Sequence, residues 1–365
     1  MVMASGEPKA KVIPLHSNSS RAMTSRRVGL RADAARRHPS LLSDPNSHPS
    51  AEEFAAVVRD IYARRGATSA ADAGSVADFD TADIPNELAQ RIAAVAEFAR
   101  KRLTGDYVVD EFGFDRHLND AVFLPLLRWF FRSWFRVEVS GIENLPETGA
   151  ALVVANHAGV LPFDGLMASV AVHDHHPAHR DLRLLAADMV FDIPVLGHAA
   201  RKAGHTMACT ADAHRLLAGG ELTAVFPEGY KGLGKQFKDR YKLQRFGRGG
   251  FVSAALRTKA PIVPCSIVGS EEIYPMLTDV KLLARLLGLP YFPVTPLFPL
   301  AGPLGLVPLP SKWHIAFGTP IPTADYDDAA ADDPMVTFEL TDNVRETIQH
   351  TLYQLLAGRR NMFFG

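Results

Sequence analysis

A histidine and an aspartate at short spacing follow the apolar run from Ala151 to Ala155. The segment reads Asn-His-Ala-Gly-Val-Leu-Pro-Phe-Asp, so Asn156 precedes His157 and six residues separate His157 from Asp164. An imidazole held by a carboxylate has a fixed tautomer and can take the proton of a substrate hydroxyl as a general base. The alternative is a polar histidine at a strand end beside an aspartate that caps the next helix. The first interpretation predicts proton abstraction from an alcohol, and the second predicts no chemistry.

A second polar block follows the apolar run from Leu222 to Phe226. It reads Phe-Pro-Glu-Gly-Tyr-Lys-Gly-Leu-Gly-Lys, and the chain beyond it is rich in Lys and Arg. A glycine-rich backbone with several cations suits a phosphate-bearing ligand. The stretch from Gly229 to Lys235 also fits the nucleotide-binding P-loop, but Gln236 stands where that loop needs Ser or Thr to hold magnesium. The block therefore predicts a substrate pocket, with a nucleotide-binding loop as the rival.

Strand-like and helix-like patterns alternate around these two blocks. Apolar runs of strand length cover residues 151–155, 222–226 and 262–268, and helical periodicity covers residues 166–172, 211–217, 251–258 and 342–356. This alternation predicts an α/β fold with a largely parallel sheet flanked by helices. Binding and catalytic sites collect at the carboxyl ends of the strands in such sheets. Both polar blocks stand at such an end.

Together the two blocks resemble the glycerolipid acyltransferase family, which includes lysophospholipid and 1-acylglycerol-3-phosphate acyltransferases. The family carries an Asn-His motif with an Asp a few residues on, a later Phe-Pro-Glu-Gly block and a still later apolar run with Val-Pro. The matching residues here are Asn156, His157, Asp164, Phe226, Pro227, Glu228, Gly229, Val263 and Pro264. The longer gap between His157 and Asp164, with its Gly-x-x-Pro insertion, looks like the branch with mono- and diacylglycerol acyltransferases.

The resemblance implies a role for each matching residue. His157, oriented by Asp164, would deprotonate the hydroxyl of a glycerolipid acceptor, which attacks the thioester of acyl-CoA or acyl carrier protein as co-substrate. Backbone donors near Gly159 would stabilise the oxyanion. Substrate-binding roles are expected for Asn156, Gly159, Phe226, Pro227, Glu228, Gly229, Lys231, Lys235 and Arg245. The reaction would need no metal and no cofactor, and a lipid-binding protein of the same fold without turnover is a further alternative.

Two apolar segments are candidates for contact with a membrane surface. From Leu118 to Arg136 aromatic residues accompany Arg128, Arg132 and Arg136 at four-residue intervals, which is typical of a helix in the lipid interface or of a core helix with one wet edge. From Leu286 to Ser311 no charged residue occurs, but seven prolines exclude a membrane-spanning helix. We expect an irregular apolar loop there, which covers a hydrophobic site, rests on a membrane or connects core elements.

The fold is expected to divide into four regions. Residues 1–50 form a basic, poorly ordered arm, and residues 51–110 form a helical extension with an acidic linker. Residues 111–325 form the acyltransferase domain, and residues 326–365 form a C-terminal helical segment. The basic arm lacks an apolar run typical of a secretory signal. We therefore expect a cytoplasmic protein attached peripherally to the inner face of a membrane.

The composition of the 365 residues excludes several classes of protein. The formal net charge is -1, so a general nucleic-acid binder is excluded. Only two cysteines, Cys209 and Cys265, occur, so neither a disulfide framework nor a cysteine-built zinc site is possible. The histidines at positions 173, 175, 176 and 179 resemble a metal cluster, but solvated histidines in a Pro-containing connection are the favoured explanation.

Overall fold

The computed structural model describes residues 98–105, 107–247 and 249–364. The predicted basic arm and most of the predicted helical extension at residues 51–110 lie outside the described residues. Near the end of that extension, residues 98–104 are helical.

A seven-stranded, mostly parallel sheet forms the centre of the described chain, as the sequence predicts. The strand order is β1-β9-β6-β2-β5-β3-β4. β9 runs antiparallel to β6, and β1 pairs in parallel with β9, so these two strands at one edge run against the other five. The strands are β1 (Glu138–Ser140), β2 (Ala151–Ala155), β3 (Leu182–Ala186), β4 (Thr206–Met207), β5 (Leu222–Val225), β6 (Ile262–Val268) and β9 (His314–Phe317).

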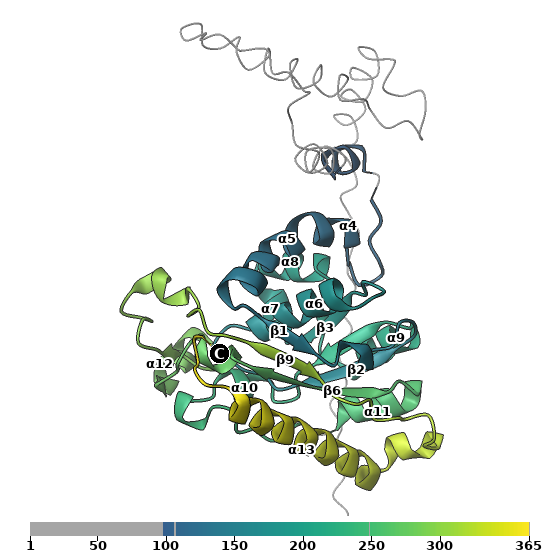
Figure 1. The fold of residues 1–365 in the computed structure, drawn as a ribbon. Coiled ribbons are helices and arrows are strands. Elements are labelled where there is room, and N and C mark those ends of the chain that lie inside the picture. Colours follow the sequence, from purple (N-terminus) through teal and green to yellow (C-terminus); the bar gives the residue numbers. More distant parts are fainter. Residues whose placement is uncertain (1–97, 106, 248, 365) are drawn as a thin grey trace, which may run out of the picture. The chain divides into compact units, whose positions relative to one another are not determined.

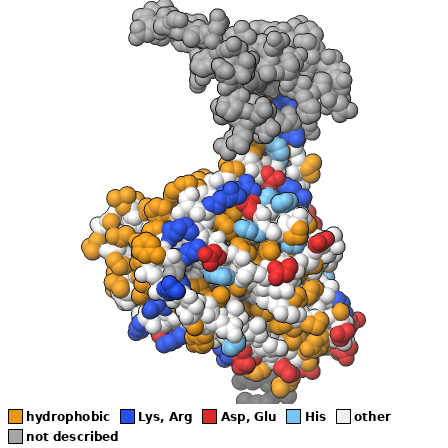
Figure 2. Space-filling model, in the orientation of Figure 1, with side chains coloured by type: hydrophobic (Ala, Val, Ile, Leu, Met, Phe, Trp, Pro, Cys, Tyr) orange, Lys and Arg blue, Asp and Glu red, His pale blue; other side chains and the backbone are white. Residues whose placement is uncertain are grey.

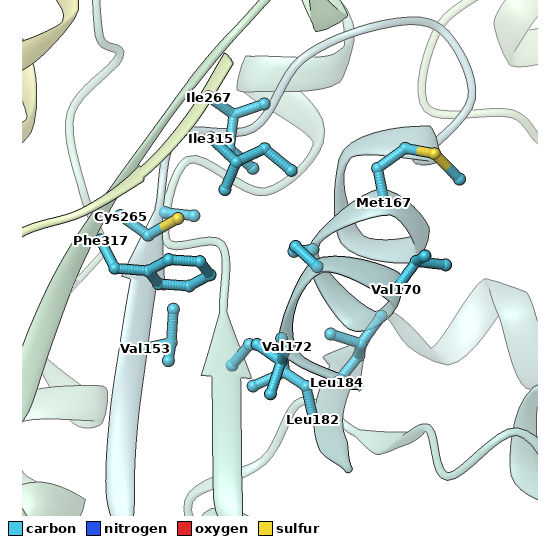
Figure 3. Close-up of a cluster of buried hydrophobic side chains, with 14 of the residues drawn as sticks. Val153, Met167, Val170, Val172, Leu182, Leu184, Cys265, Ile267, Ile315 and Phe317 are labelled. Atoms are coloured by element: carbon cyan, nitrogen blue, oxygen red, sulfur yellow. The ribbon is translucent and has the colours of Figure 1, made fainter. Parts of the chain in front are cut away.

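Helices cover both faces of the sheet, and a separate hydrophobic core fills each interface (Figure 1). β2 shows the reason, because all five of its residues are buried and successive side chains enter opposite cores. Val153 belongs to the same core as Met167 and Val170 of α6 on one side, and Figure 3 shows side chains of this core on α6 and on the strands. Leu152 joins α9, α11 and α13 on the other side. A central strand that is buried on both faces therefore has a continuous apolar sequence.

The observed helices extend beyond the residues that show helical periodicity. The longer helices are α6 (Phe163–His175), α9 (Thr210–Ala218), α11 (Gly250–Thr258) and α13 (Pro334–Gly358). The shorter ones are α7 (Asp188–Asp192), α8 (Leu196–Lys202), α10 (Tyr230–Leu233) and α12 (Lys281–Leu287). α13 begins eight residues before the predicted start because Asp333 caps it, accepting a hydrogen bond from the Met335 N–H. Its buried residues Val344 and Ile348 belong to the second core.

The aromatic segment before the sheet is helical but contains two π-helical turns. α4 (Arg116–Leu118) and α5 (Leu124–Trp129) alternate with π turns at Asn119–Phe123 and Phe130–Trp134. Arg136 lies beyond the last turn with a φ of 47°, so it leaves the predicted arginine stripe. Arg128 and Arg132 remain together and both bind Asp174, at 2.6 and 3.1 Å.

An apolar lobe, residues 277–307, projects beside the sheet and includes most of the uncharged segment. It contains β7 (Thr278–Asp279), α12, β8 (Pro293–Val294) and a 3-10 helix at Gly302–Leu306. The predicted irregular loop is therefore interrupted by short elements. Leu282 and Leu300 are 80% and 90% exposed. Among the described residues no helix has the length and hydrophobicity to cross a membrane.

Candidate functional site

His157 and Asp164 lie together at the carboxyl end of β2. The His157 Nδ1 is 2.7 Å from the Asp164 Oδ2, which also accepts a hydrogen bond from the Ala158 N–H at 2.8 Å. The Asp164 side chain is fully buried, whereas 12% of the His157 side chain remains exposed. The carboxylate thus fixes one ring nitrogen, and Nε2 is the nitrogen left to meet a substrate.

Local backbone geometry brings the two residues together. Asp164 is not the residue that begins α6, because the helix starts at Phe163 and Pro162 holds the cap position. A carboxylate in the first helical turn is stabilised by the helix dipole. Gly159 has a φ of 84°, and a Cβ there would lie 3.0 Å from the Ser270 carbonyl oxygen. The turn between His157 and Asp164 therefore requires glycine.

Glu228 connects the second polar block to the first. Its Oε1 accepts a hydrogen bond from the His157 N–H at 2.9 Å, and its Oε2 accepts one from the Gln244 N–H at 2.6 Å. The Phe226 ring lies 4.6 Å from the His157 ring, centroid to centroid. A Cβ on Gly232 would lie 2.5 Å from the His157 carbonyl oxygen. Glu228 is thus buried, and its hydrogen bonds hold the backbone at His157 against the segment that contains Gln244.

Lys235 is buried between two carboxylates, which differs from its expected place in a phosphate pocket. Its Nζ lies 3.3 Å from the Glu228 Oε2 and 3.1 Å from the Glu271 Oε1, and its side chain is 3% exposed. Two carboxylates share one ammonium group here, so one carboxyl tends to keep its proton. Burial, with the nearby charge of Glu228 added, raises the pKa of Glu271 to about 7.

The side-chain amide of Asn156 is also hydrogen-bonded within the protein. Its side-chain amide donates to the Ile267 carbonyl oxygen at 2.9 Å, and its carbonyl oxygen accepts from the Ile267 N–H at 2.7 Å. The residue is fully buried and joins the end of β2 to β6. Its position indicates that it fixes the strand end from which His157 projects.

The remaining predicted site residues are open to solvent or partly so. Lys231 and Arg245 are exposed, and Gly229, with a φ of 53°, precedes α10. Pro227 is partly buried next to Glu228. These cations remain available for a ligand near the site, unlike Lys235.

Three residues of the site carry no motif signal in the sequence. Gln244 and Glu271 bond to the Glu228 and Lys235 groups described above. Tyr291, in the apolar lobe, donates its hydroxyl proton to the Val160 carbonyl oxygen at 2.7 Å. Val160 lies in the turn between His157 and Asp164, so the lobe contacts the candidate active-site loop directly. A separation of 131 residues hides this contact from sequence reasoning.

The geometry around Gly229 differs from that of a nucleotide-binding loop. A P-loop leads into a helix whose N-terminus and Lys face the phosphates. Here the following helix, α10, has four residues, and the Lys235 ammonium group is paired with carboxylates.

The four histidines do not gather at one point, and the expected solvated connecting segment is wrong for three of them, because His173 and His175 belong to α6 and His176 is buried. His176 contacts the Leu145 carbonyl oxygen, His179 contacts the His173 carbonyl oxygen, and His175 faces the Phe131 ring. Ligand atoms of His173, Asp120 and Asp181 do lie within 4.8 Å of one another, so these three could hold a metal ion. Asp181 pairs with Arg116 at 2.8 Å, so one of the three carries a cationic partner already.

Comparison with known proteins places this site in a family. A family model described as Acyltransferase matches residues 136–268, which include both polar blocks. An uncharacterized protein of Mycobacterium tuberculosis is 77% identical over 99% of both chains, and one of Mycobacterium leprae is 74% identical over 99% of this chain and 97% of its own.

Two further similarities are more distant. A human protein named "DGAT1/2-independent enzyme synthesizing storage lipids" is 27% identical over 59% of this chain and 60% of its own. The crystal structure of the 1-acyl-sn-glycerophosphate acyltransferase PlsC from Thermotoga maritima is 18% identical, with a TM-score of 0.44, over 75% of this chain and 98% of that chain. The Asn-His and Phe-Pro-Glu-Gly blocks meet at the edge of the sheet within the residues matched by the Acyltransferase model. The chain belongs to the glycerolipid acyltransferase family.

Proposed function

We propose that this acyltransferase moves a fatty acyl group from acyl-CoA to a hydroxyl of a glycerolipid, with His157 as general base. The observation that carries the proposal is the 2.7 Å contact between His157 Nδ1 and the buried Asp164 carboxylate. With Nδ1 held, the lone pair on Nε2 takes the proton of the acceptor hydroxyl while its oxygen attacks the thioester carbonyl. Asp164 stabilises the imidazolium that forms.

The second half of the reaction returns that proton. The tetrahedral intermediate collapses, its C–S bond breaks, and the CoA thiolate leaves with the proton from the His157 imidazolium. The product is an ester, and no covalent acyl-enzyme forms. Because the Ala158 N–H already donates to Asp164, we assign oxyanion stabilisation to the backbone donors of the turn at Gly159.

The acceptor would be lysophosphatidate, another lysophospholipid or an acylglycerol. Lys231 and Arg245 are exposed and could meet an acceptor phosphate, whereas Lys235 is paired with carboxylates. The pairing of Lys235 favours acceptors with little phosphate. The name of the human relative, which refers to storage lipids, supports the same preference.

Peripheral membrane attachment is part of the proposal, and the apolar lobe is the better candidate surface. Figure 2 shows hydrophobic side chains gathered over α12 and the adjoining loop, with Lys and Arg side chains beside them. Leu286 and Leu304 are 79% and 71% exposed, and Tyr291 ties the lobe to the candidate active-site turn. An apolar surface rimmed by cations suits a bilayer containing anionic lipids.

The segment from Leu118 to Arg136 supplies less free surface. Phe131 is 3% exposed and belongs to the core, although Trp129 is half exposed. Arg128 and Arg132 are engaged by Asp174. Burial raises the pKa of Asp174, but hydrogen bonds, from Arg128 foremost, outweigh it and bring the pKa to about 2. These arginines therefore have a partner inside the protein.

The direct test incubates purified full-length protein with palmitoyl-CoA and one acceptor at a time. The acceptors are glycerol 3-phosphate, lysophosphatidate, monoacylglycerol and diacylglycerol, and products are identified by mass spectrometry together with released CoA. We expect an esterified product and an equal amount of free CoA with at least one glycerolipid. Release of free fatty acid without ester, or no turnover with any acceptor, would contradict the proposal.

A further inference from the structure

A cavity lined by basic residues lies near the C-terminal end of the described chain, outside the site considered so far. Its volume is about 450 Å³, within the range of small-molecule sites. Four cations line it, Arg240, Lys242, Arg359 and Arg360, against one carboxylate, Glu272. The cavity therefore has an excess of positive charge and would favour an anion.

Two of these cations are free of carboxylate partners among the described residues. Arg359 pairs with Glu272 at 2.6 Å, and Lys242 lies 3.5 Å from Asp239. Arg240 packs over the Phe237 ring at 4.5 Å, and neither it nor Arg360 forms an ion pair within the part of the chain that the structure describes.

Arg359 carries a further unused donor. Its side chain is 10% exposed, and its Nε is buried without a hydrogen-bond partner among the described residues. A buried donor left unpaired costs free energy unless a ligand or water meets it. Arg359 thus places a largely buried, positively charged guanidinium with one unpaired N–H in the wall of the cavity.

Neighbouring residues along the chain connect the cavity to the candidate active site. Glu272, which lines the cavity, follows Glu271, which bonds to Lys235. The segment that contributes Arg240 continues to Gln244, whose N–H donates to Glu228. β6 runs parallel to β2, so the chain after β6 leaves the sheet at the same edge as His157.

We propose that this cavity binds the phosphate groups at the nucleotide end of the CoA donor. The inference rests on the proposed function for the identity of the donor. The cations would hold the phosphates, and the Tyr353 ring, which lines the cavity and is 54% exposed, offers a face for the adenine. The long pantetheine arm would then carry the thioester toward His157. The acceptor phosphate has the same chemistry, so the test must separate donor from acceptor.

The test compares two donors in the double variant Arg240→Gln/Arg360→Gln. Both side chains lack carboxylate partners among the described residues, so folding should be preserved, and thermal unfolding checks this. We expect the KM for acyl-CoA to rise by about tenfold or more, the effect of roughly 1.4 kcal/mol. The KM for the same acyl group on N-acetylcysteamine, a thioester without the nucleotide, should stay within about twofold by the same scale. Lys238→Gln, an exposed cation of the same segment outside the cavity lining, is the matched control.

Calorimetric titration with CoA alone separates this inference from the proposed function. Binding of CoA that the double variant weakens, in a protein that shows no acyl transfer, would support the cavity and refute the reaction. Equal binding of CoA by wild type and double variant would overturn the cavity. So would equal KM increases for both donors, or an increase confined to lysophosphatidate, which would assign the cavity to the acceptor.

Discussion

The candidate active site and the apolar lobe touch each other, yet they are built in opposite ways. The site is a closed set of bonds at the ends of buried strands, in which His157, Asp164 and Glu228 each have defined partners. The lobe contacts the same turn through Tyr291, but its leucines lie in solvent. A large exposed apolar surface is typical of a site that a lipid or a partner covers. Under the proposed function, the hydrogen-bonded site carries out the chemistry and the exposed lobe contacts lipid.

The first prediction concerns the charge of the buried carboxylate. Asp164→Asn keeps the size of the side chain but removes the charge that stabilises the imidazolium. We expect kcat for acyl transfer to fall by about 10²-fold or more, within the usual contribution of general-base catalysis. Steady-state kinetics measures this, with thermal unfolding as the check on folding. An Asn variant with the wild-type kcat would show that Asp164 is only a structural partner of the turn.

The second prediction tests how strongly Glu228 supports the histidine loop. Glu228→Ala leaves Lys235 with one carboxylate and leaves the His157 N–H without its acceptor. We expect the free energy of unfolding to fall by about 3–5 kcal/mol, as for other broken buried ion pairs. Denaturant titration gives this value, and Glu228→Gln, which keeps an acceptor oxygen, should lose less. Equal losses in the two variants would argue against the hydrogen bond to His157 as the important contact.

The third prediction concerns membrane binding by the apolar lobe. Replacing Leu300 and Leu304 by Ser removes two leucines that are 90% and 71% exposed. Because a buried Leu contributes roughly 1.5–3 kcal/mol, binding to vesicles containing phosphatidylglycerol should weaken by at least about tenfold. Vesicle flotation measures the bound fraction. Phe338→Ser on α13, 60% exposed and outside the lobe, is the control and should bind like wild type. Unchanged binding of the lobe variant would remove the lobe from the membrane contact.

The fourth prediction concerns the protonation of Glu271 near Lys235. Burial raises the pKa of Glu271 from an ordinary 4.5 to about 7. Between these pH values the folded protein keeps a proton that the unfolded chain has released, so stability falls as the pH rises from 4.5 to 7. A pKa that differs by one between the folded and unfolded states corresponds to about 1.4 kcal/mol of stability. Denaturant titration at about pH 5 and about pH 7.5 measures how much free energy of unfolding is lost as the pH rises. This loss should be smaller in Glu271→Gln than in the wild type. An equal loss in both proteins would contradict the prediction.

The contact between His157 and Asp164 and the central strands are predictable from the sequence for a physical reason. β2 and β6 are buried on both faces, so their apolar runs match the observed strands from end to end. The proximity of His157 and Asp164 is predictable because Gly159 and Pro162 restrict the turn between them. β9 gives no comparable signal, since its four residues alternate between partly and fully buried in a polar context.

Burial and long-range pairing are what the sequence could not show. Lys235 and Asn156 look like ligand-binding residues in a linear motif, but their partners Glu271 and Ile267 lie far along the chain. Arg136 keeps the four-residue spacing of its helix, yet the π turn before it ends the helix and turns it away. Exposure of the lobe follows from three-dimensional packing, which composition alone does not determine.

The most direct test of the account is acyl transfer by His157→Ala measured beside its thermal unfolding. The ring contributes no buried salt bridge among the described residues apart from Asp164 and is partly exposed, so we expect a Tm within a few degrees of wild type, the range of about 1 kcal/mol. Transfer of palmitate from palmitoyl-CoA to the preferred glycerolipid should fall by about 10³-fold, as expected on removal of a general base. A folded His157→Ala protein that forms the ester at the wild-type rate would contradict the account.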